Sequence, residues 1–420
     1  MPDLVKERDA TVDGEERGAI PKEAEVVVIG AGVAGCSVAY QLAMRGKQVV
    51  VLDKRGICSG ASGRNGGLTG AGSSLHSAAG RAVYALTREN LRMLQEDLAR
   101  ELDDDFSLRL PGTLDIATTE QQYAHLEESV RRQQEHGIDV ELLDPQEVRD
   151  LVPVVSDQIL GAKLARGHGH LWPFQLVHAL ARGARHYGAR FVTHTPVTRI
   201  LTSDGAVAGV ETSAGTIAAG TVVVAANAWT PQLLPDLPQG ALVPARGQIL
   251  VTQPVPPVLP YPFGTNFDKE YGRQTPTGQI LCGGFRRLDE NEGLGLYAEQ
   301  TTPPVLGGIA GCLTSLFPRL GPLRVVRAWA GIMGFTADGL PLIGPYGDTK
   351  GLYVAAGFNG GGFSWAVATG KALAQLIVQG ISAFDLTPFD PNRFARVGVS
   401  WENPFTAGER NNPRGVISGA

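Results

Sequence analysis

Three glycines and one acidic residue near the start of the chain have the spacing of a dinucleotide-binding motif. Gly30 permits a tight turn, Gly32 lets the backbone approach a diphosphate, and Gly35 lets the following helix pack close to the preceding strand. The first N–H groups of that helix then point at the phosphates. Asp53 stands where an acid accepts hydrogen bonds from ribose hydroxyls. These residues predict that the chain binds a dinucleotide.

The residues around this motif predict the elements that it needs. Two apolar runs, 26–29 and 49–52, predict strands before the glycines and before the acidic residue. Between them, Ala34, Val38 and Leu42 recur four residues apart, as on one face of a helix. A glycine motif with its strands, helix and acid in this order is much stronger evidence than the glycines alone.

A loop rich in glycine and serine, residues 56–70, follows the second strand, where a bound dinucleotide would pass. We interpret Ser62 and Arg64 as contacts to the phosphates and Asn65 as a residue that reaches the ring system. The alternative is a loop that has no binding role, because such polar loops are common.

The last third of the chain carries a second motif, in segments 329–344 and 351–363. A strand there meets three consecutive glycines, 360–362, and then an apolar helix. Such a turn places backbone donors and the positive end of a helix beside a ligand, where they stabilise negative charge on a reduced flavin. Three glycines cost chain entropy, which favours close approach of a ligand over the alternative of a purely packed turn.

Length and charge narrow the class of protein. A chain of 420 residues is longer than one hydrophobic core usually supports, which predicts two domains. A net charge of −5 and a pI near 5.9, without a basic run, argue against a nucleic-acid partner. The N-terminal residues lack the apolar core of a signal peptide, and no apolar run is long enough to span a membrane. Four scattered cysteines form neither a disulfide framework nor a metal pattern, so we expect a cytoplasmic protein without a metal site.

Together these segments resemble the FAD-dependent amine and amino-acid oxidoreductase superfamily, which includes D-amino acid oxidase, glycine oxidase and sarcosine oxidase. The resemblance covers roughly residues 24–395 and also rests on segments 60–67, 244–248 and 278–284. It implies an α/β plus α+β fold, in which a Rossmann-type FAD-binding domain is interleaved with a substrate domain built on an antiparallel sheet.

The resemblance also implies the reaction. A C–N bond of an amine or amino acid is oxidised by hydride transfer to flavin N5, and water hydrolyses the imine product. This chemistry depends more on positioning the amine than on an acid–base pair. Two alternatives of other classes remain: a different FAD monooxygenase or dehydrogenase, and a non-catalytic flavoprotein subunit of an electron-transfer complex.

The resemblance divides the chain into interleaved parts. The FAD-binding domain is predicted over 25–105, 173–240 and 326–395, and the substrate domain over 106–172 and 241–325. A flexible extension is predicted over 1–24 and a tail over 396–420.

The motifs and the resemblance together assign binding roles to individual residues. The predicted FAD-binding residues are Gly30, Gly32, Val33, Ala34, Gly35, Asp53, Lys54, Ala61, Ser62, Arg64, Asn65, Gly66, Gly67, Val197, Ala226, Trp229, Gly331, Asn359, Gly360, Gly361, Gly362 and Phe363. The predicted substrate-pocket residues are Tyr271, Arg273, Met333 and Trp365.

Departures from the relatives refine these expectations. Some relatives attach FAD through a histidine where this chain has Asn65, and others through a cysteine in the segment that holds Ile332 and Met333, so we predict non-covalent FAD. In several amino-acid oxidases an arginine near Met333 binds the substrate carboxylate. Here Arg273, near Tyr271, is predicted to substitute for it, with a solvated strand residue as the alternative. An N-substituted amino acid or a larger amine is therefore favoured as substrate.

The electron acceptor stays open between O2 and another carrier. The sarcosine oxidases use a lysine close to the flavin in the strand that corresponds to residues 279–282, and this chain has no lysine there. Besides the acceptor, the expected partner is a small-molecule amine substrate.

Overall fold

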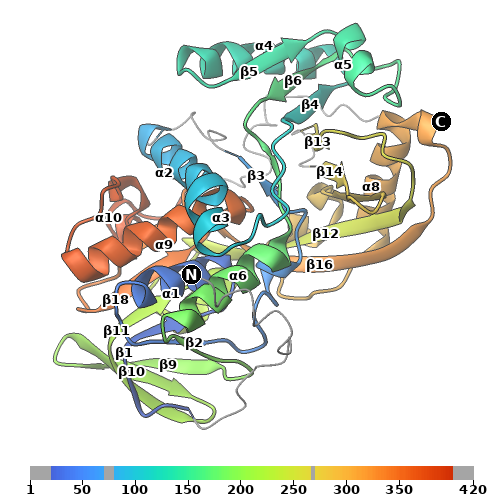
Figure 1. Ribbon diagram of the computed structural model, residues 1–420. Helices are drawn as coiled ribbons and strands as arrows, with labels where there is room; N and C mark the ends of the chain where they lie inside the picture. Colours follow the sequence, from blue (N-terminus) through green and yellow to red (C-terminus); the bar gives the residue numbers. More distant parts are fainter. Residues whose placement is uncertain (1–19, 71–79, 266–269, 401–420) are drawn as a thin grey trace.

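Two eight-stranded sheets carry the fold in the computed structural model, which describes residues 20–70, 80–265 and 270–400 (Figure 1). Most of the predicted N-terminal extension (1–19) and C-terminal tail (401–420) lies outside the described residues. The predicted fold class is confirmed: a sheet with a parallel core packs beside a mostly antiparallel one.

The first sheet is built around the predicted strand–turn–helix–strand unit, which is confirmed. Its central strands, in spatial order, are β17 (Leu342–Pro345), β18 (Leu352–Ala356), β11 (Gly215–Val224), β1 (Glu23–Ile29), β2 (Val49–Leu52) and β8 (Arg190–Val192). From β18 to β8 these strands run parallel. β9 (Val197–Ser203) and β10 (Ala206–Thr212) extend the sheet from β11 in antiparallel pairing.

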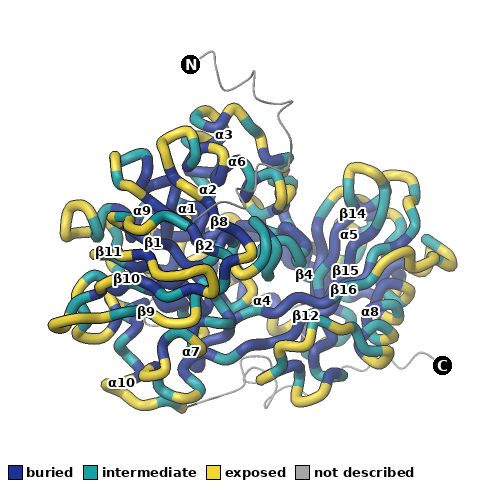
Figure 2. Tube along the Cα trace, turned by 90° about the horizontal axis from the view of Figure 1, so that it is seen from below, coloured by how far each residue is buried: buried dark blue, intermediate teal, exposed yellow. Residues whose placement is uncertain are grey.

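Both faces of this sheet are covered, which explains why its strands are continuous apolar runs. Along β1, Val26 and Val28 belong to one core cluster, and Val27 and Ile29 belong to another on the opposite face. The helices of the first cluster are α1 (Val33–Ala43), α2 (Gly80–Arg92), α3 (Leu98–Glu101), α6 (Pro173–His186) and α9 (Gly362–Gln379). In Figure 2 the buried residues concentrate along β1, β2 and α1, whereas β9 and most of α10 (Arg393–Val397) are exposed or only partly buried.

The second sheet holds long strands that reach toward the first. Its strands, in spatial order, are β16 (Val325–Thr336), β12 (Leu242–Pro254), β15 (Gln279–Gly283), β14 (Tyr271–Gln274), β13 (Phe263–Gly264), β4 (Thr113–Ala117), β6 (Gly161–Ala165) and β5 (Val140–Leu143). All of its pairings among the described residues are antiparallel except that of β13 with β4. Its helices are α4 (Glu120–Glu135), α5 (Pro145–Leu151) and α8 (Pro303–Leu316). Figure 1 shows β12 and β16 running between the two halves.

One range of the predicted domain division falls on a strand of the second sheet. Residues 326–336 are predicted in the FAD-binding domain, but β16 pairs with β12 from Val325 to Thr336 in the second sheet. The strand is continuous in sequence with the second glycine motif, and only its hydrogen-bond partner shows which sheet it joins. The domain division itself stays a prediction.

Two short elements complete the arrangement. β3 (Leu68–Thr69) pairs with β7 (Gly169–His170), and α7 (Thr230–Leu233) follows β11 closely. No helix within the described ranges is long and apolar enough to cross a membrane.

Candidate functional site

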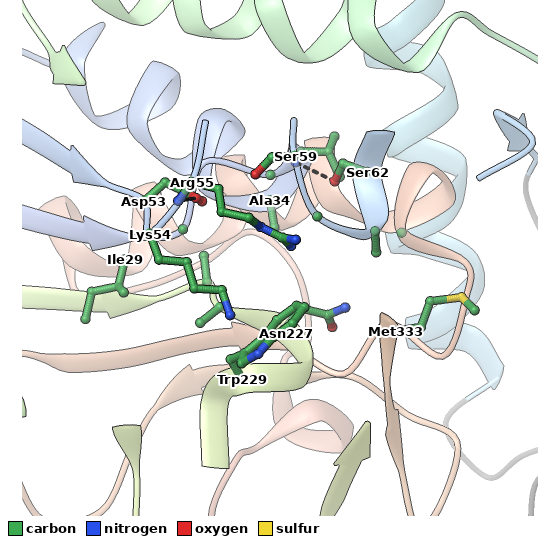
Figure 3. Close-up of a pocket in the computed structure, with 18 of the residues that line it drawn as sticks. Ile29, Ala34, Asp53, Lys54, Arg55, Ser59, Ser62, Asn227, Trp229 and Met333 are labelled. Carbon is green, nitrogen blue, oxygen red and sulfur yellow. Dashed lines mark hydrogen bonds between the residues drawn. The ribbon is translucent and has the colours of Figure 1, made fainter. Parts of the chain in front are cut away.

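A pocket of about 400 Å³ lies at the carboxyl ends of β1, β2 and β11 and extends to β16 in the second sheet (Figure 3). Ligands of open parallel sheets bind outside the carboxyl ends of the strands. In Figure 3, Asp53 and Lys54 mark one end of the pocket and Met333 the other. The pocket therefore joins the predicted dinucleotide motif to the second sheet.

The glycines of the first motif are required by close approach. Gly30 has φ +111°, and a Cβ there would lie 2.5 Å from the carbonyl oxygen of Ala225. A Cβ on Gly35 would lie 1.8 Å from the carbonyl oxygen of Gly30, which is much shorter than a van der Waals contact. Gly35 does not line the pocket, but its absent side chain lets α1 start directly behind the turn.

Asp53 is held in the pocket wall by two backbone donors. Its Oδ2 accepts from the N–H of Ala31 at 2.8 Å, and its Oδ1 accepts from the N–H of Arg55 at 2.7 Å. Each carboxylate oxygen has further acceptor capacity, which suits it to ribose hydroxyls. On the neighbouring wall, the Ser62 hydroxyl accepts from the N–H of Val33 at 3.0 Å, so Ser62 lies at the start of α1, where phosphates are expected (Figure 3).

Lys54 extends across the pocket toward Trp229, as Figure 3 shows. Its Nζ lies 3.7 Å from the centre of the indole ring, a cation–π contact. Burial lowers the pKa of Lys54, the neighbouring charge of Arg55 lowers it further, and Asp53 opposes both. Two further groups lie against Trp229: the guanidinium carbon of Arg55, 5.5 Å from the indole centre, and the ring of Tyr297, whose centre is 5.6 Å away.

Tyr297 belongs to a segment, residues 294–302, that joins the second sheet to the rim of the pocket. The two ends of the segment are attached to β12, through the N–H of Gly295 to the carbonyl of Pro244 at 2.9 Å and the N–H of Thr302 to the Gln248 side chain at 2.7 Å. The Tyr297 hydroxyl donates to the carbonyl of Ala228 at 2.9 Å. The segment therefore holds the two halves of the protein together beside the pocket.

Glu299 in this segment binds two arginines of the first half. Its carboxylate lies 2.8 Å from Arg55 Nη1 and 2.6 Å from Arg64 Nη1. Burial raises the pKa of Glu299, but the hydrogen bond and charge of Arg55, with the charge of Arg64, lower it more, so the net shift is downward. Glu299 is ionised at neutral pH and links Arg55, which lines the pocket, to Arg64.

We expect Glu299→Gln to speed the release of bound FAD. The substitution keeps an oxygen acceptor but removes the charge that holds both arginines, and ion pairs at this exposure stabilise weakly, so we expect an increase of about three- to tenfold at low salt. The rise in flavin fluorescence on dilution measures the rate. The difference between variant and wild type should shrink at high salt, because salt screens the pair.

Glu290→Gln is the matched control, since Glu290 is exposed and lies, like Glu299, between β15 and α8. Slower release from Glu299→Gln would contradict the expectation. It would mean that Glu299 competes with an anion for the arginines.

The loop after β2 is shaped by its own side chains. Asn65 Nδ2 donates to the carbonyls of Ala61 at 2.8 Å and Ser62 at 2.7 Å, and Asn65 Oδ1 accepts from the N–H of Gly67 at 2.7 Å. Asn65 lines the pocket while it fixes the turn. Its amide is therefore already bonded within the loop.

The structure brings most of the predicted residues together. The predicted residues that line the pocket are Gly30, Gly32, Val33, Ala34, Asp53, Lys54, Ala61, Ser62, Asn65, Val197, Ala226, Trp229, Met333, Gly360, Gly362 and Phe363. Those that do not line it are Gly35, Arg64, Gly66, Gly67, Gly331, Asn359, Gly361, Tyr271, Arg273 and Trp365. Several of the second set support the lining: Arg64 packs on Gly331, where a Cβ would be 2.9 Å from Arg64 Cβ.

Three predicted substrate residues lie away from this pocket. Tyr271 and Arg273 stand on β14 beneath the loop, where Arg273 Nε donates to the carbonyl of Gly66 at 2.7 Å. Arg273 is buried, and burial lowers its pKa to about 10. Trp365 packs into the first core cluster, 5.6 Å from the ring of Phe389.

Other lining residues were not predicted. They are Ile29, Leu52, Arg55, Ser59, Gly60, Pro196, Thr198, Ala225, Asn227, Gln232, Leu233 and Phe358. Arg55 could have been found, because it follows Asp53 and Lys54 directly. Pro196 and Thr198 likewise flank the predicted residue Val197, whereas Gln232 carries no such signal and reaches the pocket through the packing of α7 against β9.

The residues present fit FAD. The pocket offers a glycine turn at a helix N-terminus, a carboxylate for ribose and a buried guanidinium nitrogen, Arg55 Nε, that has no acceptor within the described part of the chain. A buried donor of this kind gains from an anionic ligand such as a diphosphate.

Comparisons with known proteins agree with this site. Residues 25–376 match the family model described as FAD dependent oxidoreductase. The chain is 30% identical to glycine oxidase of Geobacillus kaustophilus over 89% of its own length and 98% of that protein's. It is 28% identical to the mitochondrial dimethylglycine dehydrogenase of Mus musculus, of which it spans about half: 91% of this chain but 46% of that protein.

Among solved structures, the L-proline dehydrogenase from P. horikoshii superposes with a TM-score of 0.80 at 28% identity, covering 91% of this chain and all of that one. The family model covers most of the chain, including both glycine motifs. The chain therefore belongs to the family of FAD dependent oxidoreductases, and its cofactor is FAD.

Proposed function

We propose that this protein oxidises a C–N bond of an amino acid, with an N-substituted amino acid as the preferred class. The supporting observation is that the pocket runs from the dinucleotide motif to Met333, so that the far end of a bound cofactor meets side chains of the second sheet. Relatives named for glycine, dimethylglycine and proline agree with a small amine that carries a carboxylate.

When bound, FAD supplies the acceptor for the hydride that leaves the substrate carbon. The chain's own residues bind and orient the cofactor. The glycine turn and Asp53 hold the dinucleotide, and Gly360 and Gly362 open the N-terminus of α9 toward the pocket. The positive end of this 18-residue helix stabilises negative charge at the far end of the pocket.

We further propose that FAD is held without a covalent bond. At the pocket wall stand the amide of Asn65 and the thioether of Met333, neither of which is a nucleophile. The cysteine within the loop 56–70, Cys58, is buried, and burial raises its pKa to about 12, which makes it a poor nucleophile.

The acceptor in turnover is proposed to be O2 or another electron carrier. A reducing compartment such as the cytoplasm suits the protein, because its four cysteines, all within the described ranges, are buried and form no disulfide.

The test is anaerobic bleaching of the flavin absorbance of the purified, FAD-loaded protein. The panel contains glycine, sarcosine, dimethylglycine, proline, polyamines and the amines without carboxylates that match them. We expect N-substituted amino acids to bleach the flavin within minutes, and polyamines to do so much more slowly.

Bleaching by polyamines alone would mean that the substrate is a polyamine and not an amino acid, while the proposed oxidation of a C–N bond would stand. A flavin that stays oxidised across the whole panel would favour the non-catalytic subunit over an enzyme that acts alone.

A further inference from the structure

A buried asparagine on α2 holds the first turn of α9. The two helices pack against each other in the first core cluster (Figure 1). On the buried face of α2, Asn90 follows Val83 and Leu86, and all three side chains are fully buried. An apolar residue would suit this packing, whereas a buried amide costs free energy unless it is hydrogen-bonded. The hydrogen bonds of Asn90 therefore indicate what an amide does at this position.

The Asn90 amide bonds to both members of one backbone pair of α9. Its Nδ2 donates to the carbonyl of Phe363 at 2.8 Å, and its Oδ1 accepts from the N–H of Val367 at 2.9 Å. In a regular α-helix, the N–H of residue 367 is the donor for the carbonyl of residue 363. The same Oδ1 also accepts from the N–H of Ala368 at 3.2 Å. Asn90 thus sets the position of the first turn of α9 relative to the second.

Two other side chains hold the same turn. The Thr69 hydroxyl donates to the Phe363 carbonyl at 3.0 Å, and the Ser37 hydroxyl donates to the Val367 carbonyl at 3.0 Å. Thr69 lies on β3, at the end of the loop 56–70, and Ser37 lies on α1. The turn is therefore fixed from α2, from β3 and from α1.

A second irregularity follows Asn90 closely. Residues Met93–Asp97 form a π-helical turn between α2 and α3, and this turn also packs against α9. Such turns are rare and occur frequently at functional sites. The contact with α9 thus combines a buried amide with a π turn, and local departures of this kind from regular apolar packing are expected near functional sites.

The turn that Asn90 holds faces the FAD pocket. Gly360, Gly362 and Phe363 line the pocket, and the first N–H groups of a helix have no acceptor within the helix. Oxidised flavin takes up two electrons and one proton to give an anion. The N–H groups and the positive end of α9 stabilise this anion, and the effect falls off within the first turn. The ease of reduction should therefore depend on where the first turn is held.

We propose that Asn90 is a positioning residue for the reduction of the flavin. It fixes the first turn of α9, so that the N–H groups of Gly362 and Phe363 point at the part of the flavin that becomes negative. Thr69 is the second tie on this turn. Neither Asn90 nor Thr69 lines the pocket, so both act through α9. This role concerns FAD and does not depend on the class of substrate.

The test measures the two-electron reduction potential of bound FAD in wild type, Asn90→Leu and Thr69→Val. Each FAD-loaded protein is reduced anaerobically together with a dye of known potential, and absorbance gives the oxidised fraction of both. Thr369→Val is the matched control, because Thr369 is a buried residue of α9 whose hydroxyl donates within the helix, to the Trp365 carbonyl at 3.0 Å. Flavin content and the midpoint of thermal unfolding are measured for each protein.

We expect Asn90→Leu to shift the equilibrium with the dye about tenfold toward oxidised flavin, which is about 30 mV for two electrons. The reason is that the first turn is no longer held and its N–H groups move away from the developing charge. Thr69→Val should shift the equilibrium about threefold in the same direction, because Asn90 still holds the Phe363 carbonyl. Thr369→Val should keep the wild-type potential.

A wild-type potential in Asn90→Leu, at equal FAD content, would overturn the assignment. An equal shift in Thr369→Val would also overturn it, because any loosening of α9 would then be enough. If Asn90→Leu does not retain FAD, Thr69→Val decides: a wild-type potential there would mean that the ties on Phe363 do not control the flavin. No amine enters this measurement, so its outcome is separate from that of the bleaching panel.

Discussion

Replacing Gly35 with alanine is expected to reduce the FAD bound per polypeptide to less than about a tenth of wild type, through overpacking of a tight contact. The added Cβ would lie 1.8 Å from the Gly30 carbonyl oxygen, which belongs to the backbone and has no rotamer to escape to. Either α1 moves away from β1 or the turn opens. Both changes displace the N–H groups at the start of α1, where the phosphates are expected.

The measurement is the flavin absorbance per protein after purification, together with the midpoint of thermal unfolding. Gly220→Ala is the matched control, because Gly220 lies on β11 of the same sheet and a Cβ there meets nothing within 4 Å. Wild-type flavin content in Gly35→Ala would show that the helix can shift without loss of the site.

Replacing Asp53 with alanine is expected to raise the dissociation constant of FAD about 100-fold, or roughly 2.7 kcal/mol. The carboxylate holds the N–H of Ala31 at 2.8 Å and that of Arg55 at 2.7 Å, so its loss loosens the glycine turn and the chain that carries Arg55. The acceptors proposed for the ribose hydroxyls are lost as well. Hydrogen bonds to a charged group contribute about 1.5–3 kcal/mol each, and the backbone donors regain part of this from water.

Titration of the apoprotein with FAD, followed by quenching of flavin fluorescence, measures the constant. Asp53→Asn should fall between wild type and Asp53→Ala, because its amide retains one oxygen acceptor. Asp204→Asn, in an exposed turn of the same half, serves as control. If Asp53→Ala binds FAD like wild type, the carboxylate shapes only the free protein and does not contact the ribose.

Local sequence patterns were sufficient to predict the part of the site that β1, α1 and β2 form. The apolar runs of β1 and β2, the four-residue spacing in α1 and the glycines between them are all read within a few residues of one another. Their geometry is dictated by short-range sterics, such as the φ of +111° at Gly30. The structure shows Gly30, Gly32 and Asp53 in one pocket wall for this reason.

Predictions that depended on long-range packing were less successful. Met333 was predicted by its place in a motif and does line the pocket, but its strand belongs to the other sheet. Arg273 was predicted to bind the substrate because it is near Tyr271 in sequence. Only the register of β12, β14, β15 and β16 shows that Arg286 is the arginine beside Met333.

The sequence by itself determined that the chain binds a dinucleotide, and where, because a turn, a helix start and a strand end are local structures of about thirty residues. The tertiary structure alone decided which residues of the second half lie beside that site. Glu299 meets Arg55 and Arg64, and Arg286 meets Met333, across separations that no periodicity encodes. The physical reason is that hydrogen-bond pairing between distant strands, and the space left by Gly247 and Gly331, place these side chains.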